Sequence, residues 1–128
     1  MRKGPKAPEI GDLETKVLAH IWAASEPVNA HSLLEALTGH SASLSTIQTT
    51  LKRLHRKGLL SRQRLGHAYY YKAAVSREEL ISMMIEDVTH RLAGGDLEPV
   101  ICGFFDLIDR TDPALRGSLR EGRKRGKD

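Results

Sequence analysis

The stretch Ser43–Lys57, SLSTIQTTLKRLHRK, carries apolar residues at the spacing of one helix face. Leu44, Ile47, Leu51 and Leu54 follow one another at intervals of three, four and three residues. This spacing is that of an amphipathic helix with about 3.6 residues per turn. The pattern therefore predicts a helix that begins at Ser43 and buries this stripe.

The opposite face of that helix carries hydroxyls, an amide and cations, and no carboxylate. Short hydroxyls and amides reach base edges in the major groove of DNA, while Arg and Lys reach guanine or phosphate. A solvated surface is the commonest role of a polar helix face, but such faces ordinarily mix both signs of charge. The residues of this face that we expect to contact DNA are Ser45, Thr46, Gln48, Thr49, Lys52, Arg53 and Arg56.

The absence of acids extends well beyond this helix. No Asp or Glu lies between Ala36 and Arg77, although about five would be expected at the overall frequency of 16 in 128 residues. The same span holds eight cations: Lys52, Arg53, Arg56, Lys57, Arg62, Arg64, Lys72 and Arg77. This one-signed composition predicts a surface for a polyanion, and we interpret the polyanion as duplex DNA.

The segments before and after the helix predict a winged helix-turn-helix. Two helices are expected before it, one over about 12–24 with Asp12 as N-cap and one from Asn29 to about Leu37, closed by Gly39. After Gly58 the apolar period changes from 3.6 to 2, which predicts two strands over 59–65 and 68–73 joined by a tight turn at 66–67. A basic hairpin directly after a recognition helix is typical of a wing.

The charge reverses after the predicted wing. Residues 78–109 contain eight acids and one arginine, a net charge of −7. Two strongly apolar helices are expected here, one capped by Ser76 and one by Asp96, with Gly94-Gly95 between them. Too little chain remains to cover their apolar faces, so we expect a homodimer. The expected dimerisation residues are Leu80, Ile81, Met84, Ile85, Val88, Leu92, Leu97, Val100, Ile101, Phe104, Phe105 and Ile108.

The fold class expected from these patterns is mainly α with a small β-hairpin. The predicted divisions are a disordered basic arm over 1–9, a winged-helix DNA-binding domain over 10–75, a helical dimerisation region over 76–120 and a disordered basic tail over 121–128. Cys102 is the only cysteine, which favours a reducing, cytoplasmic location. None of the six histidines has another at a spacing of four, so we expect neither a metal site nor a cofactor.

With these elements placed, the chain resembles the penicillinase-repressor (BlaI/MecI/CopY) family of bacterial transcription regulators. The resemblance covers about residues 10–109. Its motifs are GDLETKVLAHIW from Gly11, STIQTTLKRLHRKGLL from Ser45, GHAYYY from Gly66, VSREEL from Val75 and GGDL from Gly94. No single motif is diagnostic, and the order and spacing of all five carry the resemblance.

The resemblance implies a homodimeric repressor that binds a palindromic operator. It also implies wing contacts from Arg62, Arg64 and either Tyr69 or Tyr71, although aromatic residues of a hairpin equally often pack against the helices. The resemblance does not identify the signal that induces this protein. Gly103-Phe104 stands where β-lactam-sensing members have a cleaved Asn-Phe bond, and the paired Cys-x-Cys motifs of copper-sensing members are absent. Proteolysis near this bond, a ligand and a partner protein such as an upstream sensor or protease all remain open as the inducing event.

Other classes of function fit the residues less well. The sequence has no glycine-rich phosphate loop and no carboxylate in the basic span to act as a base, so we expect no enzyme. A winged helix that binds only proteins, without specific DNA binding, remains the alternative, but such a module does not require a one-signed face. RNA is disfavoured because the deep, narrow groove of its duplex excludes a helix.

Overall fold

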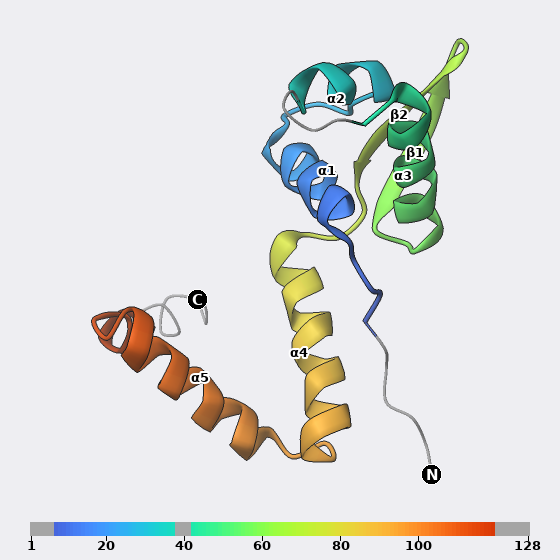
Figure 1. The fold of residues 1–128 in the computed structure, drawn as a ribbon. Coiled ribbons are helices and arrows are strands. Elements are labelled where there is room, and N and C mark those ends of the chain that lie inside the picture. Colours follow the sequence, from blue (N-terminus) through green and yellow to red (C-terminus); the bar gives the residue numbers. More distant parts are fainter. Residues whose placement is uncertain (1–6, 38–41, 120–128) are drawn as a thin grey trace, which may run out of the picture. The chain divides into compact units, whose positions relative to one another are not determined.

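The computed structural model describes residues 7–37 and 42–119, and the predictions for Gly39, for most of the basic arm and for the basic tail lie outside these residues. The chain divides into two compact units, with the boundary between Ser82 and Met83. We call residues 7–82 the N-terminal unit and residues 83–119 the C-terminal unit. The order of elements is α1, α2, α3, β1, β2, α4 and α5 (Figure 1), which confirms the predicted fold class of helices with one hairpin.

Helix α1 (Asp12–Ala23) has its N-cap one residue earlier than predicted. Gly11, and not Asp12, is the N-cap, so the prediction of Asp12 was wrong. The carboxylate of Glu14 accepts a hydrogen bond from the Gly11 N–H at 3.2 Å, and this bond satisfies a donor that would otherwise lack a partner at the helix start. Asp12 instead lies in the first turn, where its negative charge suits the helix dipole.

Helices α2 (Ala30–Ala36) and α3 (Leu44–Arg56) begin at the predicted caps. The side chain of Asn29 accepts from the N–H of Ser32 at 2.8 Å, and the hydroxyl of Ser43 accepts from the N–H of Thr46 at 3.2 Å. After α3 the chain turns at Gly58, whose φ of +82° is a conformation that favours glycine.

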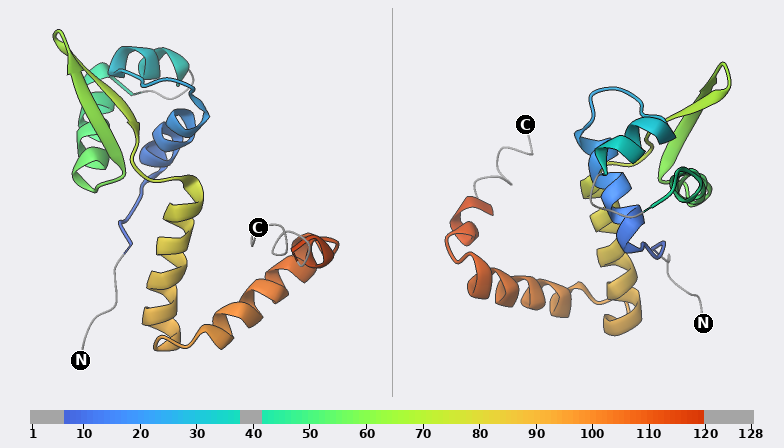
Figure 2. Two further views of the ribbon diagram at one scale, coloured as in Figure 1. Left: turned by 180° about the vertical axis from the view of Figure 1, so that it is seen from behind. Right: turned by 45° about the horizontal axis from the view of Figure 1, so that its top comes forward.

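The hairpin consists of β1 (Leu60–Leu65) and β2 (Ala68–Ala73), paired antiparallel. Leu65 pairs with Ala68, so the connection is the predicted two-residue turn at 66–67. In Figures 1 and 2 the hairpin lies alongside α3, and its turn extends past the beginning of that helix. The base of the hairpin is joined to the segment before α2, because Val28 and Tyr71 exchange backbone hydrogen bonds of 2.9 and 2.7 Å.

The core of the N-terminal unit lies where α1, α2, α3 and the hairpin meet. Ile47, Leu51 and Leu54, the apolar stripe of α3, have no exposed surface. The other buried apolar residues are Val17, Leu18, Ile21, Val28, Leu33, Leu59, Leu60, Tyr71 and Leu80. Leu80 lies at the start of α4 and is 4% exposed, so it belongs to this core, and its predicted place on the dimerisation surface was wrong.

The C-terminal unit contains most of α4 (Arg77–Ala93) and all of α5 (Leu97–Thr111). Gly94 and Gly95, both with positive φ, separate the helices, and the Asp96 carboxylate caps α5 by accepting from the Glu98 N–H at 3.1 Å. No residue of α5 is buried. No helix in the described ranges is long and apolar enough to cross a membrane.

Candidate nucleic-acid interface

Helix α3 presents its acid-free face to solvent. Ser45, Thr46, Gln48, Thr49, Lys52, Arg53 and Arg56 are all exposed, while the opposite stripe is buried in the core. Burial of three large aliphatic side chains fixes the rotation of α3 about its own axis, because turning the helix would expose them. The sequence therefore determines which side chains of α3 face outward.

The hydroxyls of α3 are not equally free to bind a ligand. The Thr46 hydroxyl lies 3.0 Å from the Ser43 hydroxyl at the helix cap. The Thr50 hydroxyl is buried and donates to the Thr46 carbonyl at 2.8 Å. By contrast, the side chains of Ser45, Gln48 and Thr49 form no hydrogen bond with any residue that the structure describes. These three are the groups with their full hydrogen-bonding capacity available.

Five cations of the expected interface are free of ion pairs with described residues: Lys52, Arg53, Arg56, Arg62 and Arg64. Lys57, the cation directly after α3, differs from them. Its ammonium lies 2.7 Å from the Glu14 carboxylate, which is only 9% exposed, and it also donates to the Glu9 carbonyl. Lys57 therefore ties the end of α3 to the start of α1.

The wing holds its arginines against one aromatic ring. The Arg62 guanidinium lies 4.1 Å from the centroid of the Tyr69 ring, and that of Arg64 lies 5.9 Å from it. The register places all of these side chains on one face, since Arg64 pairs with Tyr69 and Arg62 with Tyr71. Arg64 also donates to the Gly66 carbonyl at 3.2 Å. These contacts preorganise two cations on an exposed strand.

The two tyrosines named for the wing separate into different environments. Tyr69 is partly exposed, whereas Tyr71 is 3% exposed and belongs to the core. We therefore assign the Tyr71 ring to packing in the core. Of the two alternatives left open by the sequence, the geometry favours Tyr69.

A depression of about 600 Å³ lies between the end of α3 and the wing. It is lined by Lys52, His55, Arg56, Arg62 and Tyr69. No acidic residue lines it, so its potential is positive and suits a phosphate group. His55 was not among the predicted contacts. Its position three residues after Lys52, on the same side of a helix, is the signal that would have included it.

No group of three or more His, Cys, Asp or Glu residues suited to a metal ion occurs in the described part of the chain. The recognition surface consists instead of hydroxyls, amides and cations on a rigid helix beside a basic hairpin. A helix-turn-helix whose second helix exposes such a face, followed by a wing, defines the class of winged-helix DNA-binding proteins.

The chain belongs to the penicillinase repressor family, which matches residues 10–120. This membership places it among the DNA-binding transcriptional repressors. It is 30% identical over 120 residues to the transcriptional regulator BlaI of Mycobacterium tuberculosis, covering 91% of this chain and 86% of the relative. It is 29% identical to the penicillinase repressor of Bacillus licheniformis over 102 residues, which is 79% of each protein.

Two solved structures are similar to about three fifths of the chain. One is the solution structure of the DNA-binding domain of the repressor BlaI, with 32% identity, a TM-score of 0.49 and coverage of 62% of this chain and 93% of that one. The other is the monomeric form of Bacillus licheniformis BlaI in complex with the blaP half-operator, with 32% identity, a TM-score of 0.48 and coverage of 58% and 90%.

Proposed function

We propose that this protein represses transcription in the cytoplasm by binding a palindromic operator as a homodimer, with the N-terminal unit reading DNA and the C-terminal unit dimerising. The observation that carries the DNA half of the proposal is the exposed face of α3. That face holds one amide, several hydroxyls and cations that form no ion pair with a described residue, and it carries no carboxylate. The protein acts by binding, and no catalytic step is required of it.

The roles within the interface follow from position and chemistry. Ser45, Gln48 and Thr49 lie in the first turns of α3, the end that a helix-turn-helix directs toward base edges. Thr46 contributes mainly through its methyl group, because its hydroxyl and its N–H both contact the Ser43 hydroxyl at the cap. Arg53 and Arg56 lie further along α3 and, with the wing arginines, hold the phosphate backbone.

The dimer half of the proposal is supported by exposed apolar surface in the C-terminal unit. Leu92 is 85% exposed, Leu97 60% and Ile101 50%, and both phenylalanines of α5 are 41% exposed. Apolar surface of this extent on a monomer marks an interaction site. A second copy of the chain offers the same apolar faces, and a two-fold axis between the copies matches the symmetry of a palindrome.

Footprinting of the full chain on the DNA upstream of its own gene, together with light scattering, tests both halves. The proposal expects a protected palindrome with half-sites about one helical turn apart, or a multiple of it, and a protein mass of two chains. A protein that binds operator and scrambled duplexes equally at physiological salt would refute the repressor assignment. A monomer that still protects both half-sites at equal affinity would refute the dimer.

A further inference from the structure

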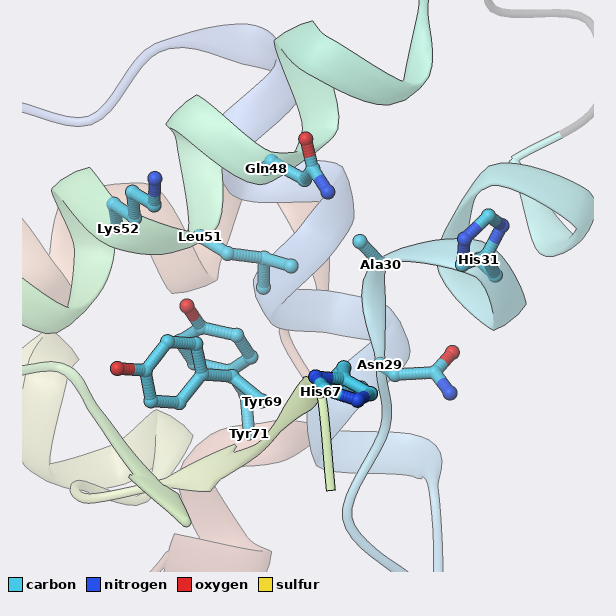
Figure 3. Close-up of a pocket in the computed structure, with 10 residues that line it drawn as sticks. Asn29, Ala30, His31, Gln48, Leu51, Lys52, His67, Tyr69 and Tyr71 are labelled. Atoms are coloured by element: carbon cyan, nitrogen blue, oxygen red, sulfur yellow. The ribbon is translucent and has the colours of Figure 1, made fainter. Parts of the chain in front are cut away.

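A second depression lies between the start of α2, the middle of α3 and the tip of the wing (Figure 3). Its volume is about 230 Å³, and all of its lining belongs to the N-terminal unit. The polar residues at its rim are Asn29, His31, Gln48, Lys52, His67 and Tyr69, with the Leu51 side chain from α3 also lining it. The site therefore combines side chains from three elements that are distant in sequence.

The rim is dominated by hydrogen-bond donors. An ammonium, two imidazoles and a phenol hydroxyl line it, and no Asp or Glu is among its lining residues. The side-chain oxygen Oδ1 of Asn29 already accepts from the Ser32 N–H at 2.8 Å, so the side-chain NH₂ of Asn29 is the group that remains, and it is a donor. Lys52 forms no ion pair with a described residue. This chemistry suits a group that carries negative charge on several oxygens.

Tyr71 adds an independent observation at the inner wall. Its side chain is 3% exposed, and its hydroxyl forms no hydrogen bond with any residue in the described ranges. Buried hydroxyls normally have a partner, so this hydroxyl is a further donor, on a residue that lines the depression, that the described residues leave unused. Tyr69 stands beside it, with ring centroids 6.3 Å apart.

We propose that this depression binds an oxyanion, either a backbone phosphate of the DNA or a small free anion such as inorganic phosphate. The DNA source rests on the proposed function, whereas the free anion does not. Gln48 and Lys52 line the depression and also lie on the reading face of α3, so an occupant acts directly on DNA binding. A DNA backbone phosphate bound in the depression strengthens DNA binding, whereas a free anion bound there competes with the DNA. His31, which the sequence alone left without a role, and His67, at the turn of the wing, become ligands of this oxyanion.

The DNA source is tested with the full chain and operator duplexes in which one phosphate at a time is replaced by a neutral methylphosphonate. The variants are His31→Ala combined with His67→Ala, and His20→Ala as a matched control, since His20 in α1 lines neither depression. We expect one phosphate in each half-site whose neutralisation weakens wild-type binding about tenfold and weakens the double variant by less than about twofold. The His20→Ala variant should behave as wild type.

The free-anion source is tested without DNA by titrating the chain with inorganic phosphate and following the histidine ring signals by NMR. The site binds a free anion if phosphate shifts the ring signals of His31 and His67 saturably but not those of His20, and if every methylphosphonate weakens wild type and double variant equally. The proposal is overturned if phosphate shifts neither histidine signal and if every methylphosphonate weakens the wild type and the double variant equally. Failure of the wild type to bind any duplex would refute the proposed function instead, and the phosphate titration would still decide this site.

Discussion

Helices α3 and α5 have similar lengths, 13 and 15 residues, but their apolar side chains lie in opposite environments. Ile47, Leu51 and Leu54 of α3 are completely buried within the single chain. Ile101 and Phe104 of α5 are 50% and 41% exposed. The single chain thus completes the packing of α3 and leaves the apolar face of α5 exposed, which is the face that our proposal assigns to a second copy of the chain. Exposure of the apolar face, rather than hydrophobicity alone, separates the two roles.

The largest expected effect comes from charging the exposed face of α5. We predict that Ile101→Glu combined with Phe104→Glu makes the protein monomeric, because a charge in an apolar interface is costly to bury. A monomer binds only one half-site at a time, so operator binding should weaken by roughly 10²–10⁴-fold. Light scattering and binding isotherms measure both effects. Glu98→Gln, in the first turn of the same helix, is the control and should remain dimeric. If the double variant remained a dimer, the exposed apolar face of α5 would not be the dimer interface.

The next largest effect is expected from the buried apolar face of α3. Leu51→Ala should lower the free energy of unfolding of the N-terminal unit by about 2–5 kcal/mol, because it leaves a cavity under α3. Leu97→Ala in α5, where the side chain is 60% exposed, should cost less than about 0.5 kcal/mol. Denaturant unfolding in the monomeric Ile101→Glu, Phe104→Glu background compares them without a contribution from association. Equal losses would mean that α5 packs against its own chain.

A smaller effect is expected on the outward side of α3. Gln48→Ala or Thr49→Ala should weaken binding to the cognate duplex by about 1–3 kcal/mol and change binding to a scrambled duplex little, because each removes an interaction with base edges. Anisotropy titrations on both duplexes at one salt concentration measure the difference. Equal losses on the two duplexes would show that this end of α3 does not read the sequence.

The smallest effect is expected from the wing. Arg62→Ala should weaken cognate and scrambled duplexes alike and flatten the plot of log affinity against log salt by about 0.9, because one phosphate fewer is neutralised. Lys57→Ala is a useful comparison, because its charge is paired with Glu14 and should leave the salt slope unchanged. If Arg62→Ala weakened binding to the cognate duplex only, Arg62 would have to be assigned to base edges rather than to the phosphate backbone.

The sequence predicted the elements well because their signals are local. The caps of Asn29 and Ser43, the end of α3 and the two-residue turn of the hairpin each depend on residues within one helical turn or one strand. The capping of α1 was misassigned because Asp12 and Gly11 are both acceptable caps. The choice between them rests on the Glu14 carboxylate, which accepts from Gly11.

Apart from His55, whose signal is local, the missed features of the candidate site depend on residues distant in sequence. The Lys57–Glu14 pair joins positions 43 residues apart, and the burial of Tyr71 depends on its pairing with Val28. Leu80 fits the apolar stripe of α4, but the core of the N-terminal unit covers it. His31 and His67 meet at one depression only after α2 and the wing are placed around α3. Periodicity within one element carries no information about such contacts.

The bridge between Val28 and Tyr71 also determines how the wing moves. Two short backbone hydrogen bonds fasten the hairpin at its base, whereas Leu65 near the turn is 55% exposed. Amide hydrogens of Val28 and Tyr71 should therefore exchange with solvent only when the whole unit opens, while those beside the turn exchange by local fraying. In the complex that we propose, such a gradient of stiffness would let the wing tip adjust to grooves of different width while α3 keeps its position on the bases.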